Sequence, residues 1–471
     1  MKEKTESWIS WHMMPTIFAL AWPTMLEQLT QTAVQYVDTA MVGALGTQAT
    51  AAVGATTTIN WLISGTLSAL GVGFLSIVAR SLGAKDPEQA RRTAAQSILV
   101  VLIAGFFFTA LTLSLSPFIP TLMQVDPEIR ALAATYFFIL YIPTLPRAAM
   151  LIFATVLRAA GDTKTPMQVG LTVNFINIIL NFLLIYPSRT SNIFGQAVHV
   201  PGAGLGVTGA AIASAVSVAV GGICITIAFL RHPLISPRGQ KILPDWKLLR
   251  PCLQIALPNM LQRFTTYLGY VVFAAMINSL GEVSAAAHTI ANTVESAFYI
   301  PGYGMQAAAS TLAGNALGSQ DYPRMRGLTR TIIVIEGSLM AISGSLLFLF
   351  APEMMCLFSG TPQVISLGST VLRMVAVSEP FFGIAIILEG ILLGAGDTIR
   401  PFYYNIFGMW VVRILGTFLC TQTFGMGLVS AWACMISHNL ILFTLFLIYC
   451  LLSKKSPLNP YRHSAPSNSF C

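Results

Sequence analysis

The sequence predicts an all-α membrane protein with twelve transmembrane helices, arranged as two parallel-repeat six-helix bundles around a central cleft. Its composition, a series of long apolar segments and an internal duplication carry this prediction. Hydrophobic residues make up 55 % of the 471 residues and charged residues only 9 %. A soluble domain has about 25 % charged residues. This chain therefore cannot cover a water-facing surface, and a polytopic membrane protein is the class that fits.

Apolar segments of about 20 residues or more follow one another along the chain, as transmembrane helices require. The first extends through Pro15 and Pro23 without a clear small-x-small cleavage pattern, so we interpret it as a span and not as a signal peptide. The predicted spans are 14–42, 48–79, 92–116, 129–157, 166–186, 204–230, 249–279, 284–316, 327–350, 364–393, 401–421 and 427–452.

These spans define five predicted regions. They are an N-terminal tail (1–13), an N-terminal bundle (14–230), a linker (231–248), a C-terminal bundle (249–452) and a C-terminal tail (453–471). Of the 26 lysines and arginines, only Arg130 and Arg189 fall outside when the N-terminus is placed in the cytoplasm, and four more lie within spans. The positive-inside rule therefore predicts a multi-pass protein of the plasma (inner) membrane with cytoplasmic tails and linker. It also accounts for the net charge of +8 without nucleic acid.

The two halves of the chain are related by an internal duplication. Residues 21–46, "AWPTMLEQLTQTAVQYVDTAMVGALG", align without a gap with residues 256–281, "ALPNMLQRFTTYLGYVVFAAMINSLG", and ten of the 26 positions are identical. The same offset of 235 places "LRAAGDTKTP" (157–166) on "LLGAGDTIRP" (392–401). Because each half holds an even number of spans, the repeats are parallel, and such repeats typically enclose an alternating-access cleft.

The first span carries a stripe of polar residues. Glu27, Gln31, Gln35 and Asp38 are spaced by 4, 4 and 3 residues, so they share one helix face. A central acid costs about 2.5–3.5 kcal/mol in lipid, so the stripe is expected to face the bundle interior or an aqueous cleft. Polar contacts that only hold neighbouring helices together remain the alternative.

Other polar residues lie in later spans. Asn177 and Asn181 form an i, i+4 pair in the fifth span, and Ser214 lies in the sixth. Ionisable residues within spans are functional candidates, and the second half offers Arg263, His288, Asn292, Glu295, Glu379 and Glu389. A structural ion pair of Glu295 or Glu379 with Arg263 is an equal alternative. Arg147 and Arg263 are expected in the interior, and Arg373 and Arg413 are expected near the interface.

The motifs together resemble those of MATE (multidrug and toxic compound extrusion) transporters over residues 14–452. They are "VDTAMVGALG", "SLGAKDPEQARR", "AAHTIANTVES", "GVTGAAIAS" and the duplicated "AGDT" segments. The pattern of the first span is most similar to the DinF-like branch. The resemblance implies a pump that exports lipophilic, often cationic compounds, driven by H⁺ or Na⁺ as coupling ion and without other cofactors. Its expected partners are these small substrates and the lipid bilayer, and it is expected to function as a monomer.

The resemblance also implies site residues. Asp38, Asn177, Asn181, Ser214 and Ala210 match the cation-coupling positions of the first half, where Na⁺ would be the one metal ion held. Gln31 and Tyr136 match positions that line a substrate cavity, to which the stripe adds Gln35 and Glu27. Some relatives carry an acid at the position of Asn181, and its loss favours H⁺ over Na⁺. In the NorM-like branch, acids in spans seven and ten carry coupling, and Thr266 and Phe382 stand at those positions here.

Two other functions are alternatives to export. A lipid-linked oligosaccharide flippase of related fold would need several cationic residues in the cleft to hold pyrophosphate, and Arg147 and Arg263 keep that alternative open. A non-transporting receptor would be expected to carry a soluble domain. The sequence has no P-loop and no catalytic Ser/His/Asp or metal-hydrolase motif, so we do not expect an enzyme.

Overall fold

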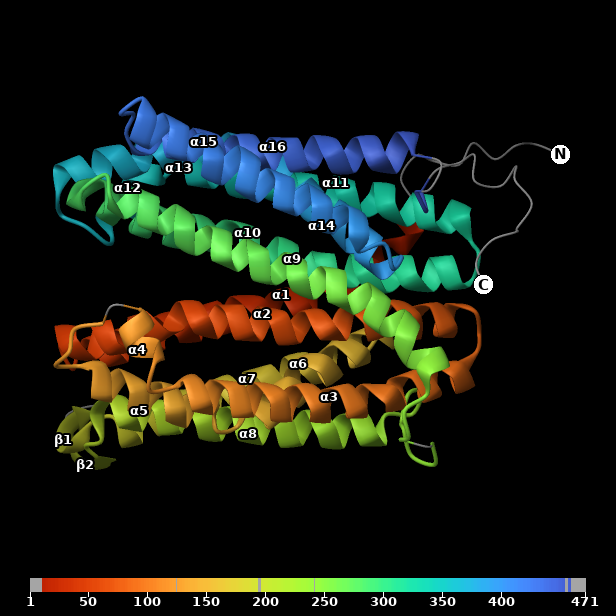
Figure 1. Cartoon of the computed structure of the whole chain (residues 1–471), viewed down its shortest axis with the longest axis horizontal. Helices are drawn as coiled ribbons and strands as arrows, with labels where there is room; N and C mark the ends of the chain where they lie inside the picture. The colour runs from red at the N-terminus through yellow and green to blue at the C-terminus, as the bar shows by residue number, and fades with distance from the viewer. Residues whose placement is uncertain (1–10, 124, 194–195, 241, 454–455, 459–471) are drawn as a thin grey trace.

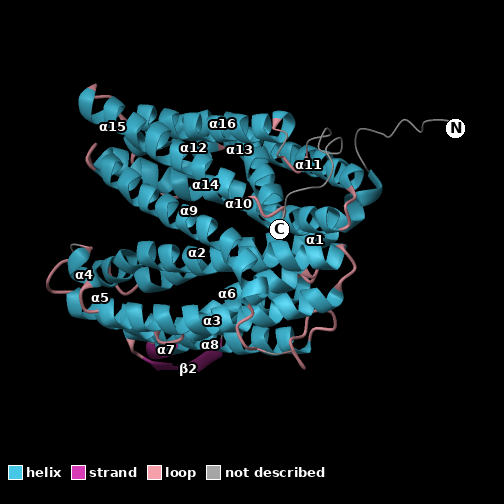
Figure 2. Cartoon of the chain, turned by 45° about the vertical axis from the view of Figure 1, so that its right-hand side comes forward, coloured by secondary structure: helices cyan, strands magenta, loops and turns pink. Residues whose placement is uncertain are grey.

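The computed structural model describes residues 11–123, 125–193, 196–240, 242–453 and 456–458. Most of the two predicted tails and Lys241 of the linker lie outside these ranges. Nearly all of the described chain is helical, as Figure 2 shows, and the helices form two lobes that lie side by side (Figure 1). The predicted all-helical fold with two lobes and twelve spans is confirmed by the likeness to solved structures reported below.

The first lobe is built by the N-terminal half of the chain. After a short 3₁₀ turn, η1 (Trp11–Met13), its helices are α1 (Met14–Gly43), α2 (Thr47–Gly83), α3 (Pro87–Leu115), α4 (Ile119–Leu122), α5 (Arg130–Tyr141), α6 (Thr144–Ala159), α7 (Lys164–Leu184) and α8 (Gly206–Arg231). The fourth predicted span is bent by 51° between α5 and α6. Pro143 and Pro146 fall at this bend, where each removes a backbone N–H from the helical ladder.

The second lobe repeats this order. Its helices are α9 (Trp246–Asn278), α10 (Glu282–Gly318), α11 (Tyr322–Leu349), α12 (Ala351–Cys356), α13 (Pro362–Gly394), α14 (Ile399–Ile406), α15 (Gly416–Phe418) and α16 (Leu428–Leu452). Two π-helical stretches, η2 (Phe407–Leu415) and η3 (Leu419–Thr423), join α14 and α15 into one span, Ile399–Thr423. Such π-turns rotate the side chains that follow them.

One feature was not predicted. The connection between α7 and α8 is an antiparallel hairpin of β1 (Pro187–Ile193) and β2 (Gln196–Ala203), in which Pro187 pairs with Ala203. It lies at one end of the molecule, opposite the α8–α9 connection (Figure 1). We call these ends the hairpin end and the linker end.

By length and composition alone, eight described helices are apolar enough to cross a membrane, or nine when α5 and α6 count as one span. The other three long helices, α1, α9 and α10, fall short of that measure and carry many of the polar residues predicted within spans, among them Glu27, Asp38, Arg263 and Glu295. All three lie where the lobes meet, since α1 packs against α10 and α9 packs against α2. Several of their polar residues, such as Gln262 and Glu295, are buried within the protein.

The duplication recurs in the backbone at the turns. Gly46 and Gly281, which are 235 residues apart, both have positive φ (113° and 101°) ahead of α2 and α10. Lys85 and Gln320 form a second pair, at 59° and 54°. The residues that follow them, Asp86 and Asp321, cap α3 and α11 in the same way, each accepting a 2.9 Å hydrogen bond from the backbone N–H three residues on.

At the linker end, α2 and α10 pack backbone against backbone. A Cβ on Gly83 would lie 2.0 Å from the carbonyl oxygen of Asn315, and a Cβ on Gly318 would lie 2.0 Å from that of Arg80. These two contacts exchange under the offset of 235. The lobes are therefore related by a pseudo-twofold axis that passes through this contact, as parallel repeats require.

Hydrogen bonds extend the same contact. Ser76 of α2 donates to the Gly394 carbonyl of α13 (2.9 Å), and Thr311 of α10, its duplicate, donates to the Arg158 carbonyl of α6 (3.1 Å). The first helix of each half also reaches across: Ile17 and Ala21 of α1 pack in the core of the second lobe, and their duplicates Cys252 and Ala256 of α9 pack in that of the first.

We expect Gly83→Ala to lower the thermal stability of the purified protein, because the new methyl group must push the Asn315 backbone away. Overpacking of this kind costs about 1–3 kcal/mol. Gly54→Ala on the same helix is the matched control, since a Cβ there meets nothing within 4 Å. Thermal unfolding of both variants in one detergent is the measurement, and an equal effect of the two substitutions would contradict the assignment of this contact.

Candidate cation and substrate site

Asp38 lies on α1 against α7, within a chain of amide and hydroxyl groups. Asn181 donates from Nδ2 to Asp38 Oδ1 at 2.6 Å, and Asn177, one turn earlier on α7, lies 3.1 Å from Asn181. Ser214 of α8 is 3.1 Å from the Asn177 amide. The structure therefore brings Asp38, Asn177, Asn181 and Ser214 together, as their predicted common site requires. Ala210 is one turn before Ser214 on α8 and is buried.

The orientation of the Asn177 amide follows from the hydrogen bonds available to it. With its nitrogen toward Asp38, that nitrogen lies 2.8 Å from Oδ1 and 3.1 Å from Oδ2, and its oxygen accepts from the Ser214 hydroxyl. Asp38 then receives hydrogen bonds from two neutral amides. Asn181 Oδ1 is buried and has no hydrogen-bond partner. The cluster thus has an oxygen free to accept a proton on Asp38 or to coordinate a small cation.

A second polar group stands beside this cluster. Tyr136 of α5 is buried and lies within electrostatic range of both Asp38 and Arg147. Arg147 is held in place: it donates to Asn60 Oδ1 at 3.0 Å and to the Leu140 carbonyl at 3.3 Å, and it stacks over the Tyr141 ring at 5.2 Å. Arg147 is therefore an interior residue, as predicted, and all of these contacts of its guanidinium are with groups of the first lobe.

The polar stripe of α1 divides into two parts. At its start, Glu27 is ion-paired with Arg158 of α6, whose Nη2 lies 2.8 and 2.7 Å from the two carboxylate oxygens. Gln31 and Gln35 are exposed on the surface of the protein, whereas Asp38 is half-buried. Glu27 thus fixes α1 to α6, while the two glutamines that precede Asp38 have exposed side chains.

In the second lobe, Glu389 of α13 is surrounded by amides. Gln262 of α9 donates to its Oε1 at 2.6 Å, Asn405 of α14 donates to the same oxygen at 3.2 Å, and Gln306 of α10 donates to Oε2 at 3.2 Å. Arg263 lies within electrostatic range of this carboxylate. Among the described residues Arg263 forms no ion pair with Glu295 or Glu379, so the structural alternative for those two acids is not observed.

The expectation that Arg413 lies near the interface is wrong. Arg413 of η2 is buried, with its guanidinium 4.1 Å from the Phe273 ring centre and 5.1 Å from that of Tyr270. The aromatic faces replace water as partners for the charge, which the spacing of one arginine in an apolar span does not reveal. Arg373, in contrast, is exposed and lies over Phe348.

The polar residues of α10 do not share one environment. His288 is buried between the rings of Phe273 and Trp432, at 5.7 and 5.8 Å, and Glu295 is buried within electrostatic range of Arg413. Asn292, between them in sequence, is exposed. One buried acid, Glu336 of α11, was missed by sequence reasoning, because a single acid in an apolar span has no periodic partner that marks it.

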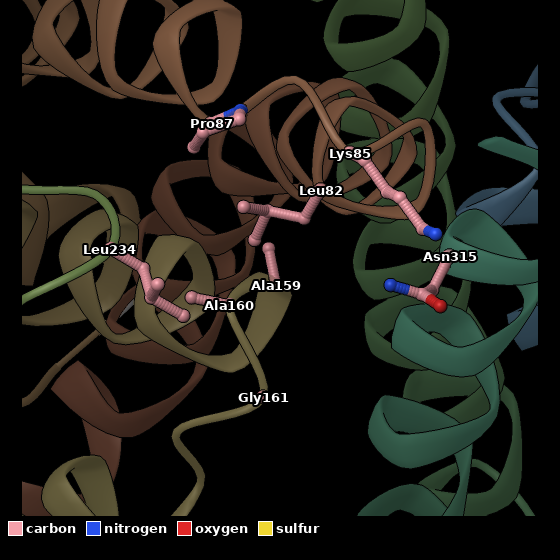
Figure 3. A pocket seen from close by; sticks show the side chains of 8 residues that line it. All are labelled: Leu82, Lys85, Pro87, Ala159, Ala160, Gly161, Leu234 and Asn315. Carbon is pink, nitrogen blue, oxygen red and sulfur yellow. The ribbon is translucent and has the colours of Figure 1, made fainter. Parts of the chain in front are cut away.

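One hollow of the protein lies away from these residues. It has a volume of about 490 Å³ at the linker end and is lined by Leu82, Lys85, Pro87, Ala159, Ala160, Gly161, Leu234 and Asn315 (Figure 3). Asn315 approaches it from the second lobe and the other residues belong to the first lobe or its linker. The hollow contains none of the predicted site residues, and we assign the site from the Asp38 contacts.

Comparisons with known proteins identify the family and the fold of this chain. The MatE family model matches residues 23–183 and 258–419, one match in each half. A probable multidrug resistance protein NorM of Thermotoga maritima is 27 % identical over 438 residues, covering 93 % of this chain and 92 % of the relative. A second such protein, from Photorhabdus laumondii, is 25 % identical over 431 residues, covering 90 % and 92 %. The solved structure of a multidrug resistance MATE family transporter in an outward-facing conformation matches with a TM-score of 0.83 at 23 % identity, covering 92 % of this chain and 94 % of that one.

The Glu27–Arg158 pair is open to a double-mutant test. Both side chains are mostly buried, at 16 and 18 % exposure. Removing one partner leaves an unpaired buried charge and costs about 3–5 kcal/mol, whereas replacing both is far milder. We therefore expect Arg158→Met to destabilise the protein strongly and the Glu27→Gln/Arg158→Met double variant to recover much of that loss. Thermal unfolding of the two singles and the double provides the check; additive losses would show that the pair has no coupling energy.

Proposed function

We propose that this chain, which belongs to the MatE family of transporters, couples the export of lipophilic, often cationic compounds to a cation bound at Asp38. The observation that carries the proposal is the environment of Asp38. Its carboxylate is held by neutral amides, and no lysine, arginine or histidine of the described chain forms an ion pair with it. Such a carboxylate in a membrane protein is stabilised by taking up a positive charge, whether a proton, Na⁺ or a cationic drug.

The proposed cycle uses competition for this one negative charge. In the outward-open protein, Asp38 takes up the coupling ion, which removes the attraction for a cationic drug, and the drug leaves. After the lobes rock, the ion is released to the cytoplasm, and the bare carboxylate attracts the next drug. For a neutral substrate, one charge that moves inward across 100 mV supplies about 2.3 kcal/mol, which corresponds to a gradient of about fiftyfold. A monovalent cationic drug exchanged one for one with the ion moves no net charge, so the concentration gradient of the ion alone drives its export.

The surfaces between the lobes suit amphipathic substrates. Gln31 and Gln35 are exposed beside Asp38. Trp61 of α2 and Tyr267 of α9 face each other from the two lobes, with ring centres 6.3 Å apart. Aromatic rings attract lipophilic cations through their faces. The close contact of the lobes at the linker end, together with these exposed groups, supports an outward-open state with substrate binding between Asp38 and the aromatic pair.

Protons are the better-supported coupling ion. The site has one carboxylate, with Asn181 where an acid stands in some relatives, and one carboxylate with two or three neutral oxygens is a weak Na⁺ site. This arrangement and the pattern of the first span favour the DinF-like branch. The absence of acids at Thr266 and Phe382 argues against coupling by the NorM-like route. We propose that the protein lies in the inner membrane with both termini and the linker in the cytoplasm. We also propose that a single chain is the working unit.

The flippase alternative loses its main support. It required cationic residues free to hold pyrophosphate. Arg147 is occupied by Asn60 and the Leu140 carbonyl, and Arg263 lies beside Glu389. The Arg147 guanidinium is thus already used in hydrogen bonds within the first lobe, and the charge of Arg263 is opposed by that of Glu389.

Asp38→Asn is expected to abolish coupled efflux while leaving the protein folded, because the asparagine keeps the shape and the hydrogen-bonding capacity of the carboxyl group and loses its charge. Efflux of a cationic dye such as ethidium from reconstituted vesicles is the measurement. Glu128→Gln, at an exposed acid of the loop before α5, is the control and should keep wild-type flux. Undiminished efflux by Asp38→Asn would remove Asp38 from the mechanism.

The coupling ion is tested with imposed pH and Na⁺ gradients in separate vesicle runs. We expect the wild type to respond to the pH gradient alone. Asn181→Asp adds a second carboxylate next to Asp38 and is expected to create a response to the Na⁺ gradient, since two carboxylates bind Na⁺ better than one. Wild-type flux driven by Na⁺ alone, or Asn181→Asp indistinguishable from the wild type, would contradict this account of the site.

A further inference from the structure

Two acids of the second lobe are fully buried and have no hydrogen-bond partner. Glu336 lies halfway along α11 with 0 % exposure, and Glu379 lies halfway along α13 with 1 %. All four of their carboxylate oxygens are buried and unpaired. Other buried or half-buried acids have a partner or a nearby cation: Glu27 has an arginine, Asp38 and Glu389 have amides, and Glu295 lies within electrostatic range of Arg413. This contrast raises the question of what neutralises the negative charges of the Glu336 and Glu379 carboxylates.

Their location is tightly packed. A Cβ on Gly302 of α10 would lie 2.6 Å from Glu336 Oε1, and one on Gly383 of α13 would lie 3.3 Å from the same oxygen. On the other side, a Cβ on Gly344 of α11 would lie 3.3 Å from the Glu379 Cβ. The two side chains thus occupy spaces left by glycines where α10, α11 and α13 pack together. The Glu336 carboxylate therefore lies directly against the backbones of α10 and α13.

The charges around the two acids do not neutralise them. The carboxylates of Glu336 and of Glu295 on α10 lie within electrostatic range of Glu379. The hydroxyl of Tyr299 on α10 lies within electrostatic range of Glu295 and Glu379. The positive charge of Arg413 of η2 acts on Glu295. Glu336 itself has no charged group of opposite sign acting on it. Like charges so placed in a low dielectric cannot all be ionised.

The arrangement of Glu336 and Glu379 indicates whether a metal ion or a proton neutralises them. A metal ion needs several oxygen ligands around one point, and no group of three acids, histidines or cysteines in the described chain has that geometry. A proton needs only one oxygen and no extra volume. We propose that Glu336 and Glu379 form a second proton-binding site, in the second lobe, which holds protons in the state seen here and releases them as the lobe changes shape.

The surrounding backbone provides the means for such a change. Pro380 follows Glu379 directly in α13, and Pro301 precedes Gly302, the residue that faces Glu336, in α10. A proline inside a helix removes one ladder hydrogen bond and creates a point at which the helix can bend. Both acids therefore lie at the level where neighbouring helices are interrupted. Bending there would admit water to the carboxylates and allow proton exchange.

The proposal rests on the proposed antiport function only for the direction in which the protons move. If it is right, the wild type moves more protons per substrate than the Asp38 site alone can carry. Proton occupancy itself can be measured without transport, so failure of this proposal and failure of the antiport function are distinguishable.

The first test is infrared spectroscopy of the full chain in lipid at neutral pH. A protonated carboxyl group has a carbonyl band that a carboxylate lacks and that shifts on exchange into D₂O. We expect Glu336→Gln and Glu379→Gln each to remove part of this band, and Glu353→Gln, at an exposed acid of α12, to leave it unchanged. The Asp38→Asn protein should retain it, which keeps the test valid where a Glu336 variant fails to fold. Absence of the band from both the wild type and Asp38→Asn overturns the proposal.

The second test separates a coupled site from an acid that is permanently neutral. At steady state in vesicles, the logarithm of the ethidium gradient rises with the imposed pH difference, with a slope equal to the number of protons moved per dye. We expect Glu336→Gln to lower this slope by about one proton while ethidium still binds. An unchanged slope in both Glu336→Gln and Glu379→Gln overturns the proposal. No flux by the wild type under any gradient would instead contradict the antiport function.

Discussion

The backbone contact of α2 and α10 at the linker end is the constraint on which the two-lobed arrangement depends. Gly83 against the Asn315 carbonyl and Gly318 against the Arg80 carbonyl bring the two helix axes closer than any side chain would allow. Because the two halves are related by one offset, a single close approach is made twice, symmetrically about the axis between the lobes. The cross-lobe hydrogen bonds of Ser76 and Thr311 follow the same symmetry. A contact of small residues and backbone carbonyls is also one that can separate without exposing a large apolar surface or an unpaired charge. It suits a joint that must open and close.

The duplication preserved this scaffold and redistributed the acids on it. Glu27 and Gln262 are duplicates, and both reach from the first helix of their half to its fourth span. In the first lobe the acid is on α1 and its partner, Arg158, is on α6; in the second lobe the acid is Glu389 on α13 and Gln262 is its amide donor. The same helix contact is therefore made once by an ion pair and once by an amide–carboxylate pair. Asp38 has no such counterpart, since Phe273 takes its place and stacks against Arg413.

Sequence reasoning recovered the features that follow from hydropathy and spacing. Apolar length placed the spans close to the observed helices, and i, i+4 spacing placed Asn177 and Asn181 on one helix face. Their common site with Asp38 was implied by the resemblance to MATE transporters and not by spacing. It could not recover contacts between groups far apart in the chain. The Glu27–Arg158 pair joins residues 131 apart, and the aromatic partners of buried Arg413 come from α9. The bend between α5 and α6 falls at Pro143 and Pro146, which were not interpreted as a break in the span because the apolar run continues through them. The β1–β2 hairpin lies in a segment without a clear strand pattern. Glu336 was missed because burial, and not periodicity, sets it apart.

The two lobes therefore differ in how they handle buried negative charge, although they share one backbone plan. Near the first-lobe site, Asp38 faces amides, exposed glutamines and the space between the lobes, so its charge can be met by an ion or a drug from solution. In the second lobe, Glu336 and Glu379 are sealed between three helices without partners, so only a proton can neutralise them in place. The charge of a carboxylate open to solvent depends on what binds to it. The charge of a fully buried carboxylate depends on whether the surrounding helices stay packed. The two lobes thus share one backbone plan but differ in their acids. In the proposed mechanism, Asp38 of the first lobe responds to the binding of an ion or a drug, and Glu336 and Glu379 of the second lobe respond to a change in helix packing.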